Sequence, residues 1–192
     1  MVSTLILHVP FLRLCGYYML KLSLCLWCVV SDIEKIENAR DALLQTARTL
    51  LVSVTGNDGI PDMGTSPFLR DKAGCFYIYT SELSGHVKAL IAGNEARFML
   101  IADEDASQNI WARVRVKFTA HRDIIERGSK AFHAIADKME PEFGPTMGLI
   151  RQFSDFHLVK ITPITGVIVT GFASAFVVTG PEFTIGAQVK NA

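Results

Sequence analysis

Two clusters of cationic and hydroxyl side chains in this 192-residue chain have the chemistry to bind a small anion. The first cluster lies in one short segment and comprises Thr80, Ser81, Ser84, His86 and Lys88. A strand is predicted to end there and a helix to begin, so free backbone N–H groups and the helix dipole would favour a phosphate. The alternative interpretation is that Ser84 only caps the helix, while His86 and Lys88 are solvated.

The second cluster follows one long predicted strand, over about residues 109–121. Alternation along that strand would place three cations on one face, namely Arg113, Arg115 and Lys117. Cations in line on a strand repel one another unless an anion or carboxylates lie opposite them. The pattern therefore predicts either an outer face paired with neighbouring acids or a site for a ligand phosphate.

The charge balance and the missing motifs narrow the possible functions. Lys and Arg number 19, as do Asp and Glu, and zero net charge argues against a nucleic-acid-binding face, which works by neutralising phosphates. Beyond residue 30 the sequence has no His or Cys pair at metal-ligating spacing, no P-loop and no G-x-S-x-G motif. We therefore expect no dedicated metal site and one small anionic cofactor, and we assign no catalytic residue.

Residues 1–30 differ in composition from the rest of the chain, with 22 apolar residues, two basic residues and no acid. Arg13 and Lys21 interrupt the apolar runs, whereas a membrane span needs about 20 largely apolar residues. We expect this segment to lie outside the fold, as a mis-assigned start or, alternatively, as a membrane or export segment. The C-x-x-C spacing of Cys25 and Cys28 is interpreted as coincidence, and Cys75 as a buried apolar residue.

Turn and capping residues divide the remaining sequence into short strands and helices. A capping box at Ser31–Glu34 predicts a first helix. Strands are expected at about 49–55, 60–70, 75–80, 96–102, 109–121, 155–162 and 165–178, and helices at 84–91 and 129–152, the latter broken at Gly144–Pro145. Pro61 and Pro67 would confine their strand to an edge or a bulge. Short connections and alternating faces favour a mainly β (α+β) antiparallel barrel at residues 31–180 and a frayed tail at 181–192.

Several short motifs occur in a recognisable order between Leu50 and Thr179. They are Thr65–Arg70, Ser81 with His86 and Leu90, Met99–Glu104, Trp111–Arg113 with Arg115, Phe143–Gly144, Asp155–Leu158, Thr162–Pro163, Gly166 and Gly171–Ala175. In this order they resemble the FMN-binding split-barrel proteins related to pyridoxamine phosphate oxidase, and more closely their HugZ/HutZ haem-utilisation branch. The resemblance implies a six-stranded antiparallel split barrel with inserted helices that forms a homodimer and binds flavin at the subunit interface.

The resemblance also implies that the two cationic clusters converge on the phosphate of FMN. The implied cofactor-binding residues are Thr80, Ser81, His86, Lys88, Arg113 and Arg115, with Pro67 and Phe68 near the ring system. The sequence departs from the family at Ala89, where an asparagine is usual, and at Val114, which breaks a basic run. Haem is the alternative cofactor, although residues 181–192 lack the C-terminal histidine of haem-degrading members, so His86 or His157 would have to bind the iron.

Three functional hypotheses follow from these observations. The first is a cytoplasmic, homodimeric, flavin-dependent oxidoreductase that uses FMN and acts on a small molecule. The second is a haem-binding or haem-degrading protein, and the third is a ligand-binding barrel without catalysis. Neither nucleic acid nor a membrane is an expected partner, unless residues 1–30 attach the protein to a membrane or direct its export.

Overall fold

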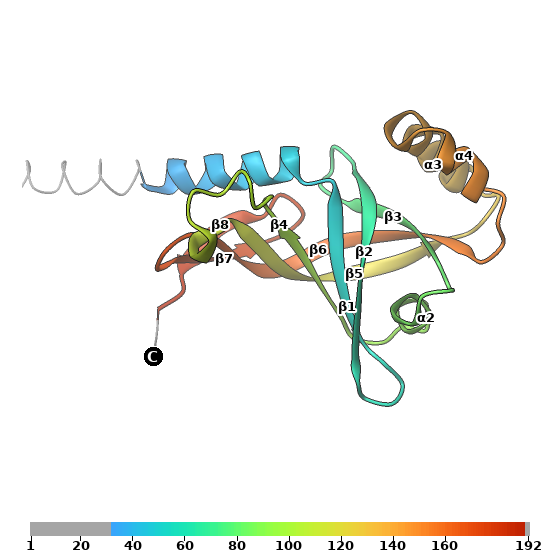
Figure 1. Ribbon diagram of the computed structural model, residues 1–192, viewed down its shortest axis with the longest axis horizontal. Coiled ribbons are helices and arrows are strands. Elements are labelled where there is room, and N and C mark those ends of the chain that lie inside the picture. The colour runs from blue at the N-terminus through green and yellow to red at the C-terminus, as the bar shows by residue number, and fades with distance from the viewer. Residues whose placement is uncertain (1–31, 191–192) are drawn as a thin grey trace, which may run out of the picture. The chain divides into compact units, whose positions relative to one another are not determined.

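The computed structural model describes residues 32–190 (Figure 1). The predicted capping residue Ser31 and the segment 1–30 lie outside the described residues. The first helix covers residues 32–46. The chain divides into two compact units at Asn38, and all strands and the later helices belong to the second unit, which begins at Ala39.

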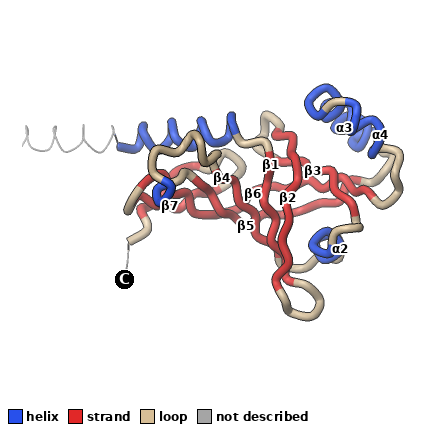
Figure 2. Tube along the Cα trace, viewed as in Figure 1, coloured by secondary structure: helices blue, strands red, loops and turns tan. Residues whose placement is uncertain are grey.

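Within residues 32–190, eight antiparallel strands form one sheet. Figure 2 draws the strands in red. They are β1 (Thr49–Thr55), β2 (Pro61–Arg70), β3 (Phe76–Ser81), β4 (Ala96–Ile101), β5 (Arg115–Ile125), β6 (Phe156–Gly171), β7 (Ser174–Thr179) and β8 (Thr184–Gln188). Their order in the sheet is β3-β2-β1-β4-β5-β6-β7-β8, and β3 also pairs with β6. This extra pairing closes strands β1 to β6 into a barrel, which confirms the predicted six-stranded fold.

The hairpin of β1 and β2 shows how local sequence builds the barrel. Gly59 has a φ of +78°, a conformation that suits glycine in a tight turn, and Pro61 begins β2 opposite Thr55. β2 pairs with β1 as far as Pro67 and with β3 from Phe68 onward. Proline has no N–H to donate, so it is tolerated at a strand start and where the pairing partner changes.

The predicted strand at 109–121 is wrong at its beginning. Ile110–Ala112 form a short 3-10 helix, η1, and β5 starts only at Arg115. The side chain of Asn109 accepts a hydrogen bond from the backbone N–H of Trp111 and so favours the turn over an extended chain. Arg113 therefore does not share a strand face with Arg115 and Lys117.

The predicted break at Pro163–Gly166 is also wrong, because β6 runs through it without interruption. In the pairing with β5, Thr119 lies opposite Thr165 and Ala120 opposite Pro163, so Ile164 is an extra residue. A bulge of this kind bends a strand without ending it. The chain turns instead at 171–174, before β7.

The C-terminal residues are not a frayed tail as far as they are described. Thr184–Gln188 form β8, which pairs with β7. Phe183, next to this strand, is only 1% exposed, and the guanidinium of Arg70 donates to the carbonyl of Pro181. Burial of an aromatic ring holds this segment against the barrel.

Besides η1, three α-helices lie between the strands: α2 (Gly85–Ile91), α3 (Lys130–Phe143) and α4 (Pro145–Ile150). α2 packs on β1 and β2, while α3 and α4 lie together near β3 (Figure 1). As predicted, the helical region breaks at Gly144, whose φ is +76°. Within residues 32–190, no helix combines the length and apolar composition needed to cross a membrane.

Two apolar cores share β3, one on each of its faces. Phe76 and Ile78 point into the barrel, where the ring of Phe76 stacks on that of Phe118. Tyr77 and Tyr79 point the other way and join a second core with residues of α3 and α4. The alternation of β3 therefore decides which side chains can meet.

Candidate functional site

The end of β3 separates two hydroxyl groups that were predicted to act together. Thr80 faces the barrel interior, is 8% exposed and accepts a hydrogen bond of 3.5 Å from the hydroxyl of Ser66. Ser81, on the opposite face, donates to the carboxylate of Asp155. Successive strand residues point to opposite faces, so these two hydroxyls do not bind a common ligand atom from one side.

A few buried polar residues lie on β2, β3 and α2. In the described part of the chain the buried polar residues are Ser66, Thr80 and His86, the last 9% exposed. The imidazole of His86 lies so close to Gly64 that a Cβ at this position would overlap the ring. A glycine on β2 is therefore required for this helix to approach the barrel.

At the N-terminus of α2, where an anion site was predicted, a carboxylate lies close to the first residue of the helix. Ser84 occupies the N-cap position, as predicted, but its side chain makes no capping hydrogen bond. A Cβ built at Gly85 would lie 2.8 Å from a carboxylate oxygen of Asp62. The negative charge of Asp62 would repel a phosphate bound at this helix terminus. Lys88 is exposed and borders an open pocket of about 590 Å³ that also includes Asp62.

A second polar arrangement joins the loop after β3 to the beginning of β6. The imidazole of His157 bonds to the carboxylate of Glu82, and the backbone N–H of Glu82 donates to the carbonyl of Asp155 over 3.0 Å. The side chain of His157 keeps 25% of its surface exposed. Together with the Ser81–Asp155 bond, these contacts hold the loop in one position beside a histidine that solvent can reach.

The arginines lie elsewhere on the barrel. Arg113 pairs with Glu104 over 2.8 Å and also donates to the carbonyl of Ala102. Arg115 donates to the carbonyl of Arg113 over 2.8 Å. Arg113 therefore fits the interpretation in which the predicted cations pair with neighbouring acids and do not bind a ligand phosphate. Lys117, on β5, is exposed.

One tyrosine outside these clusters has a shifted pKa. Burial, together with a hydrogen bond from its hydroxyl to the carboxylate of Asp71, raises the pKa of Tyr77 to about 12. Both effects disfavour the phenolate, because it would lose hydration and face a nearby negative charge. Tyr77 therefore stays protonated and serves the structure of the β2–β3 turn.

Comparisons with known proteins agree with this architecture, although no family model matches the chain. The chain is 28% identical over 138 residues to Heme oxygenase HutZ of Vibrio cholerae, which covers 72% of this chain and 78% of HutZ. The crystal structure of HutZ superimposes with a TM-score of 0.59 at 23% identity, over 78% of this chain and 96% of that one.

Two further solved structures share the fold. ChuZ of Campylobacter jejuni matches with a TM-score of 0.67 at 26% identity, over 83% of this chain and 63% of ChuZ. A Clostridium acetobutylicum protein of the pyridoxine phosphate oxidase family, related to general stress protein 26, matches with a TM-score of 0.56 at 15% identity, over 76% and 95% of the two chains. The chain is thus similar in sequence to HutZ and shares its fold with a split-barrel protein of the pyridoxine phosphate oxidase family.

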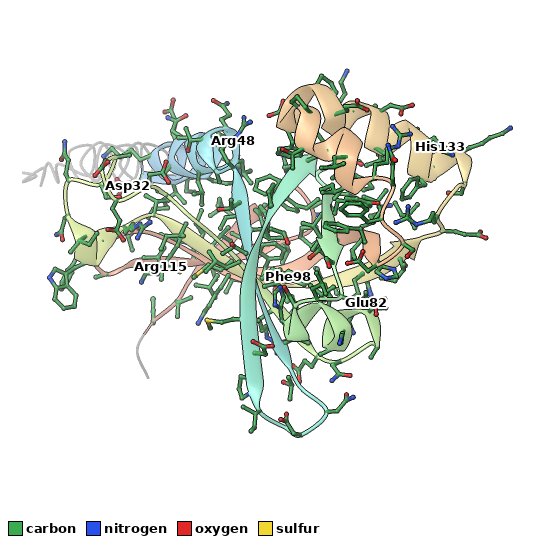
Figure 3. All side chains as sticks on the ribbon, turned by 45° about the vertical axis from the view of Figure 1, so that its right-hand side comes forward. Asp32, Arg48, Glu82, Phe98, Arg115 and His133 are labelled. Atoms are coloured by element: carbon green, nitrogen blue, oxygen red, sulfur yellow. The ribbon has the colours of Figure 1, made fainter. Side chains whose placement is uncertain are left out.

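Within one chain, this split barrel does not bring the two predicted phosphate-binding clusters together. Ser81 pairs with Phe156 at one end of β6, whereas Arg115 pairs with Val169 near the other end. At about 3.3 Å per residue, some 40 Å of strand separates the two pairs. Figure 3 accordingly shows Arg115 and Glu82, which follows Ser81, on different sides of the barrel.

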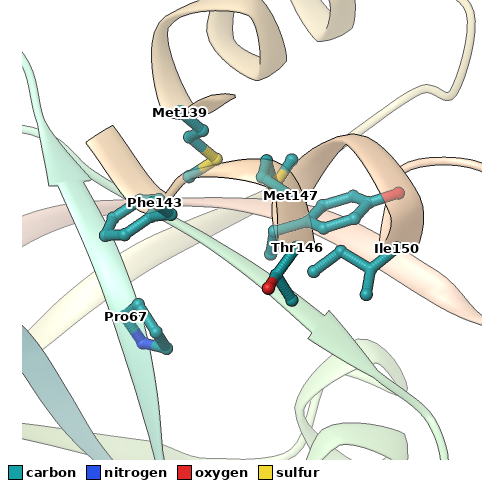
Figure 4. Close-up of a pocket in the computed structure, with 7 residues that line it drawn as sticks. Pro67, Met139, Phe143, Thr146, Met147 and Ile150 are labelled. Carbon is teal, nitrogen blue, oxygen red and sulfur yellow. The ribbon is translucent and has the colours of Figure 1, made fainter. Parts of the chain in front are cut away.

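Pro67 and Phe68, which were both expected near a cofactor's ring system, lie on opposite faces of β2. Phe68 is buried inside, with its ring centroid 5.1 Å from that of Phe76. Pro67 points outward and borders a cavity under α3 and α4 (Figure 4). Alternation along β2 is again the cause.

Sequence reasoning missed several residues that shape these sites. Gly64, Ser66 and Asp62 all lie on the inward face of β2, and Glu82 is the partner of His157. A polar residue at an inward position of an alternating strand was the available signal for Ser66. The partner of His157 lies 75 positions earlier in the chain, and no local pattern indicates such a pair.

Proposed function

We propose that this protein is a haem-binding split barrel of the HutZ type. The observation that carries the proposal is the 28% identity to Heme oxygenase HutZ over 138 residues. A split barrel described as a heme binding protein of Mycobacterium smegmatis shares the fold, with a TM-score of 0.62. The comparisons therefore favour haem over FMN as the ligand to test first.

His157 is our first candidate for the iron ligand. Its imidazole is partly exposed, and the carboxylate of Glu82 holds the ring in one orientation. A carboxylate partner is a common feature of metal-binding histidines, because it orients the ring and makes the nitrogen more basic. His86 is the less suitable candidate, since it is buried against Gly64 and would have to leave that position.

Haem, when bound, would supply the iron chemistry, while the chain's own groups would position the ligand. Glu82 would keep His157 oriented and accept its N–H hydrogen bond. The Ser81–Asp155 bond would hold the loop that carries Glu82. The enzymatic degradation of haem, the activity named for HutZ, is a further step that this proposal leaves to experiment.

FMN is the second candidate, and one structural feature favours it. Arg115 and Lys117 lie on the outer face of the sheet among half-buried apolar residues, namely Leu51, Met99, Ile101, Val167, Val169 and Val177. A phosphate bound by Arg115 and by the segment near Ser81 would require a second copy of the chain, because one copy holds them far apart. We therefore propose that FMN binding depends on a homodimer formed on this face.

The test is a haem titration of the full-length protein, followed by the Soret absorption band. The wild type should bind haem, and His157→Ala should weaken binding at least tenfold. His121→Ala is the matched control, since His121 is an exposed histidine on β5 and should leave binding unchanged. The proposal is wrong if the wild type does not bind haem, and the assignment of His157 is wrong if both variants bind equally.

Reconstitution of the same full-length protein with FMN distinguishes the FMN proposal from the haem proposal. If haem is the natural ligand, the absorption spectrum after incubation with FMN should show less than one bound flavin per chain. A stable flavin spectrum that is lost in Arg115→Ala, together with a dimer by light scattering, would replace haem with FMN. Loss of haem absorbance in air with a chemical reductant such as ascorbate would test degradation.

A further inference from the structure

An open pocket of about 330 Å³ lies between the C-terminal end of α2 and the later part of β5. Arg122 is the charged side chain in its lining, and it pairs in register with Ile161 of β6, which is buried in the barrel. Arg122 therefore lies on the inward side of β5, beside the helix. The residues that line the pocket are Leu90, Ile91, Gly93, Ala120, His121, Arg122 and Ile124.

Arg122 is the one arginine of residues 32–190 whose guanidinium makes no hydrogen bond or ion pair with the protein. It is half-buried, and burial lowers its pKa because the charged guanidinium loses hydration. Three other half-buried arginines each pair with a carboxylate: Arg70 with Glu182 over 3.2 Å, Arg113 with Glu104 over 2.8 Å and Arg151 with Asp137 over 2.7 Å. The fold provides no such partner for Arg122 within the part of the chain that the structure describes.

The groups around Arg122 do not replace that partner. Asp123 is the next residue, but alternation directs it to the other face of β5, where it pairs in register with Lys160. Gly93, at the end of α2, lies close enough that a Cβ there would be 3.8 Å from Nη2 of Arg122. The end of a helix is weakly attractive to a cation, yet no backbone carbonyl of residues 32–190 accepts a hydrogen bond from this guanidinium. Its donors therefore remain available to a ligand in the pocket.

The rest of the lining is mostly aliphatic. Ile124 keeps 43% of its surface exposed, which is unusual for a large apolar side chain, and Leu90 and Ile91 face it from α2. A guanidinium binds a carboxylate through two parallel hydrogen bonds, because its planar fork matches the two oxygens. A ligand with a carboxylate at one end and an aliphatic chain at the other would satisfy both parts of the pocket. Ligand pockets commonly have volumes of about 300–1,000 Å³, so this pocket suits a small molecule.

The pocket stands apart from the residues considered for haem and FMN. None of the residues predicted to bind either cofactor lines it. Glu82, the partner of His157, precedes α2, whereas the pocket lies at the C-terminal end of that helix. The register partner of Arg122, Ile161, is four residues beyond His157 on β6, which is about 13 Å of strand.

We infer that this pocket is a binding site for a small aliphatic monocarboxylate, whose carboxylate pairs with Arg122 and whose chain lies against Leu90 and Ile124. The inference goes beyond the proposed function, because it assigns a second ligand and a second place in the fold. The charge of Arg122 and the aliphatic wall together define the ligand, since neither inorganic phosphate nor an uncharged alcohol satisfies both.

The test compares hexanoate with 1-hexanol by calorimetry on the full-length protein. Hexanoate should bind at one site per chain, and 1-hexanol, with the same chain length but no charge, should bind at least tenfold more weakly. Arg122→Met should weaken hexanoate binding at least tenfold, and Arg122→Lys should weaken it less because it keeps the charge without the planar fork. Lys160→Met is the matched control, because it removes the same charge from a neighbouring position on the other face and should leave binding unchanged.

The inference is overturned if the wild type does not bind hexanoate, or if it binds 1-hexanol or inorganic phosphate as tightly. Equal hexanoate binding by Arg122→Met and Lys160→Met would overturn it as well. The haem titration of Arg122→Met should match that of the wild type, and a loss of haem binding in this variant would overturn the inference by merging the two sites. A wild type that binds hexanoate but not haem would contradict the proposed function alone.

Discussion

The two faces of β3 differ in what they do with their polar groups and their space. On the inward face, Thr80 contacts Ser66, and the ring of His86 lies so close to Gly64 that this position has no room for a Cβ. On the outward face, Tyr79 turns its hydroxyl to Arg127 and leaves an apolar cavity beside its ring. Polar side chains alone do not identify a ligand site, since those on the inward face contact other groups of the protein. The open volume lies on the face that carries few of the predicted site residues.

The largest expected change in the free energy of unfolding concerns the close contact between Gly64 and His86 on the inward face. Gly64→Ala should destabilise the protein by about 2–3 kcal/mol, because the new methyl group overlaps the His86 ring and overpacking of a rigid site costs this much. Urea unfolding would measure the change. Thr65→Ala, at the neighbouring exposed position, should change stability by less than about 0.5 kcal/mol. Equal stability of the two variants would show that α2 can move away from β2, and the contrast between the faces would be lost.

A smaller effect is expected on the outward face. Arg127→Met should destabilise the fold by about 1–2 kcal/mol, since it removes hydrogen bonds to the Tyr79 hydroxyl and to the Arg151 carbonyl at an exposed position. Arg97→Met is the control, because Arg97 pairs with Glu95 on the surface and should contribute little. The α3–α4 pair would not depend on Arg127 if the two variants unfolded at the same urea concentration.

The smallest effect concerns pH. The folded protein holds the proton of Tyr77 up to a pKa of about 12, above its ordinary value of 10.0, so stability is full below pH 10 and falls as the pH rises towards 12. By pH 11 the loss should be about 1 kcal/mol, and Tyr77→Phe should show a shallower fall over the same range because this group no longer ionises. Unfolding experiments at several pH values would measure both slopes. Equal slopes of stability against pH in the wild type and in Tyr77→Phe would mean that burial does not raise the pKa of Tyr77.

Local sequence was sufficient to predict most of the backbone. Glycine at a positive φ after β1, prolines at tolerated strand positions and alternating apolar residues predicted the hairpin and the barrel. The strand boundaries predicted before β5 and within β6 were wrong, because a side-chain hydrogen bond or pairing with a neighbouring strand changed the backbone there. Asn109 turned the chain before β5, and the bulge at Ile164 carried β6 past Pro163.

The sequence by itself determined the split-barrel fold, the position of the hairpin and the helices, and the residue types available for a site. Only the tertiary structure decided which of those residues meet. Closure of the barrel by the pairing of β3 with β6 placed Arg115 far from Thr80 and Ser81. The physical reason is that a strand's period is a local property, whereas register and closure depend on partners distant in the chain. The cavity at Pro67 likewise exists only because α3 and α4, more than sixty positions later, pack over β2 and β3.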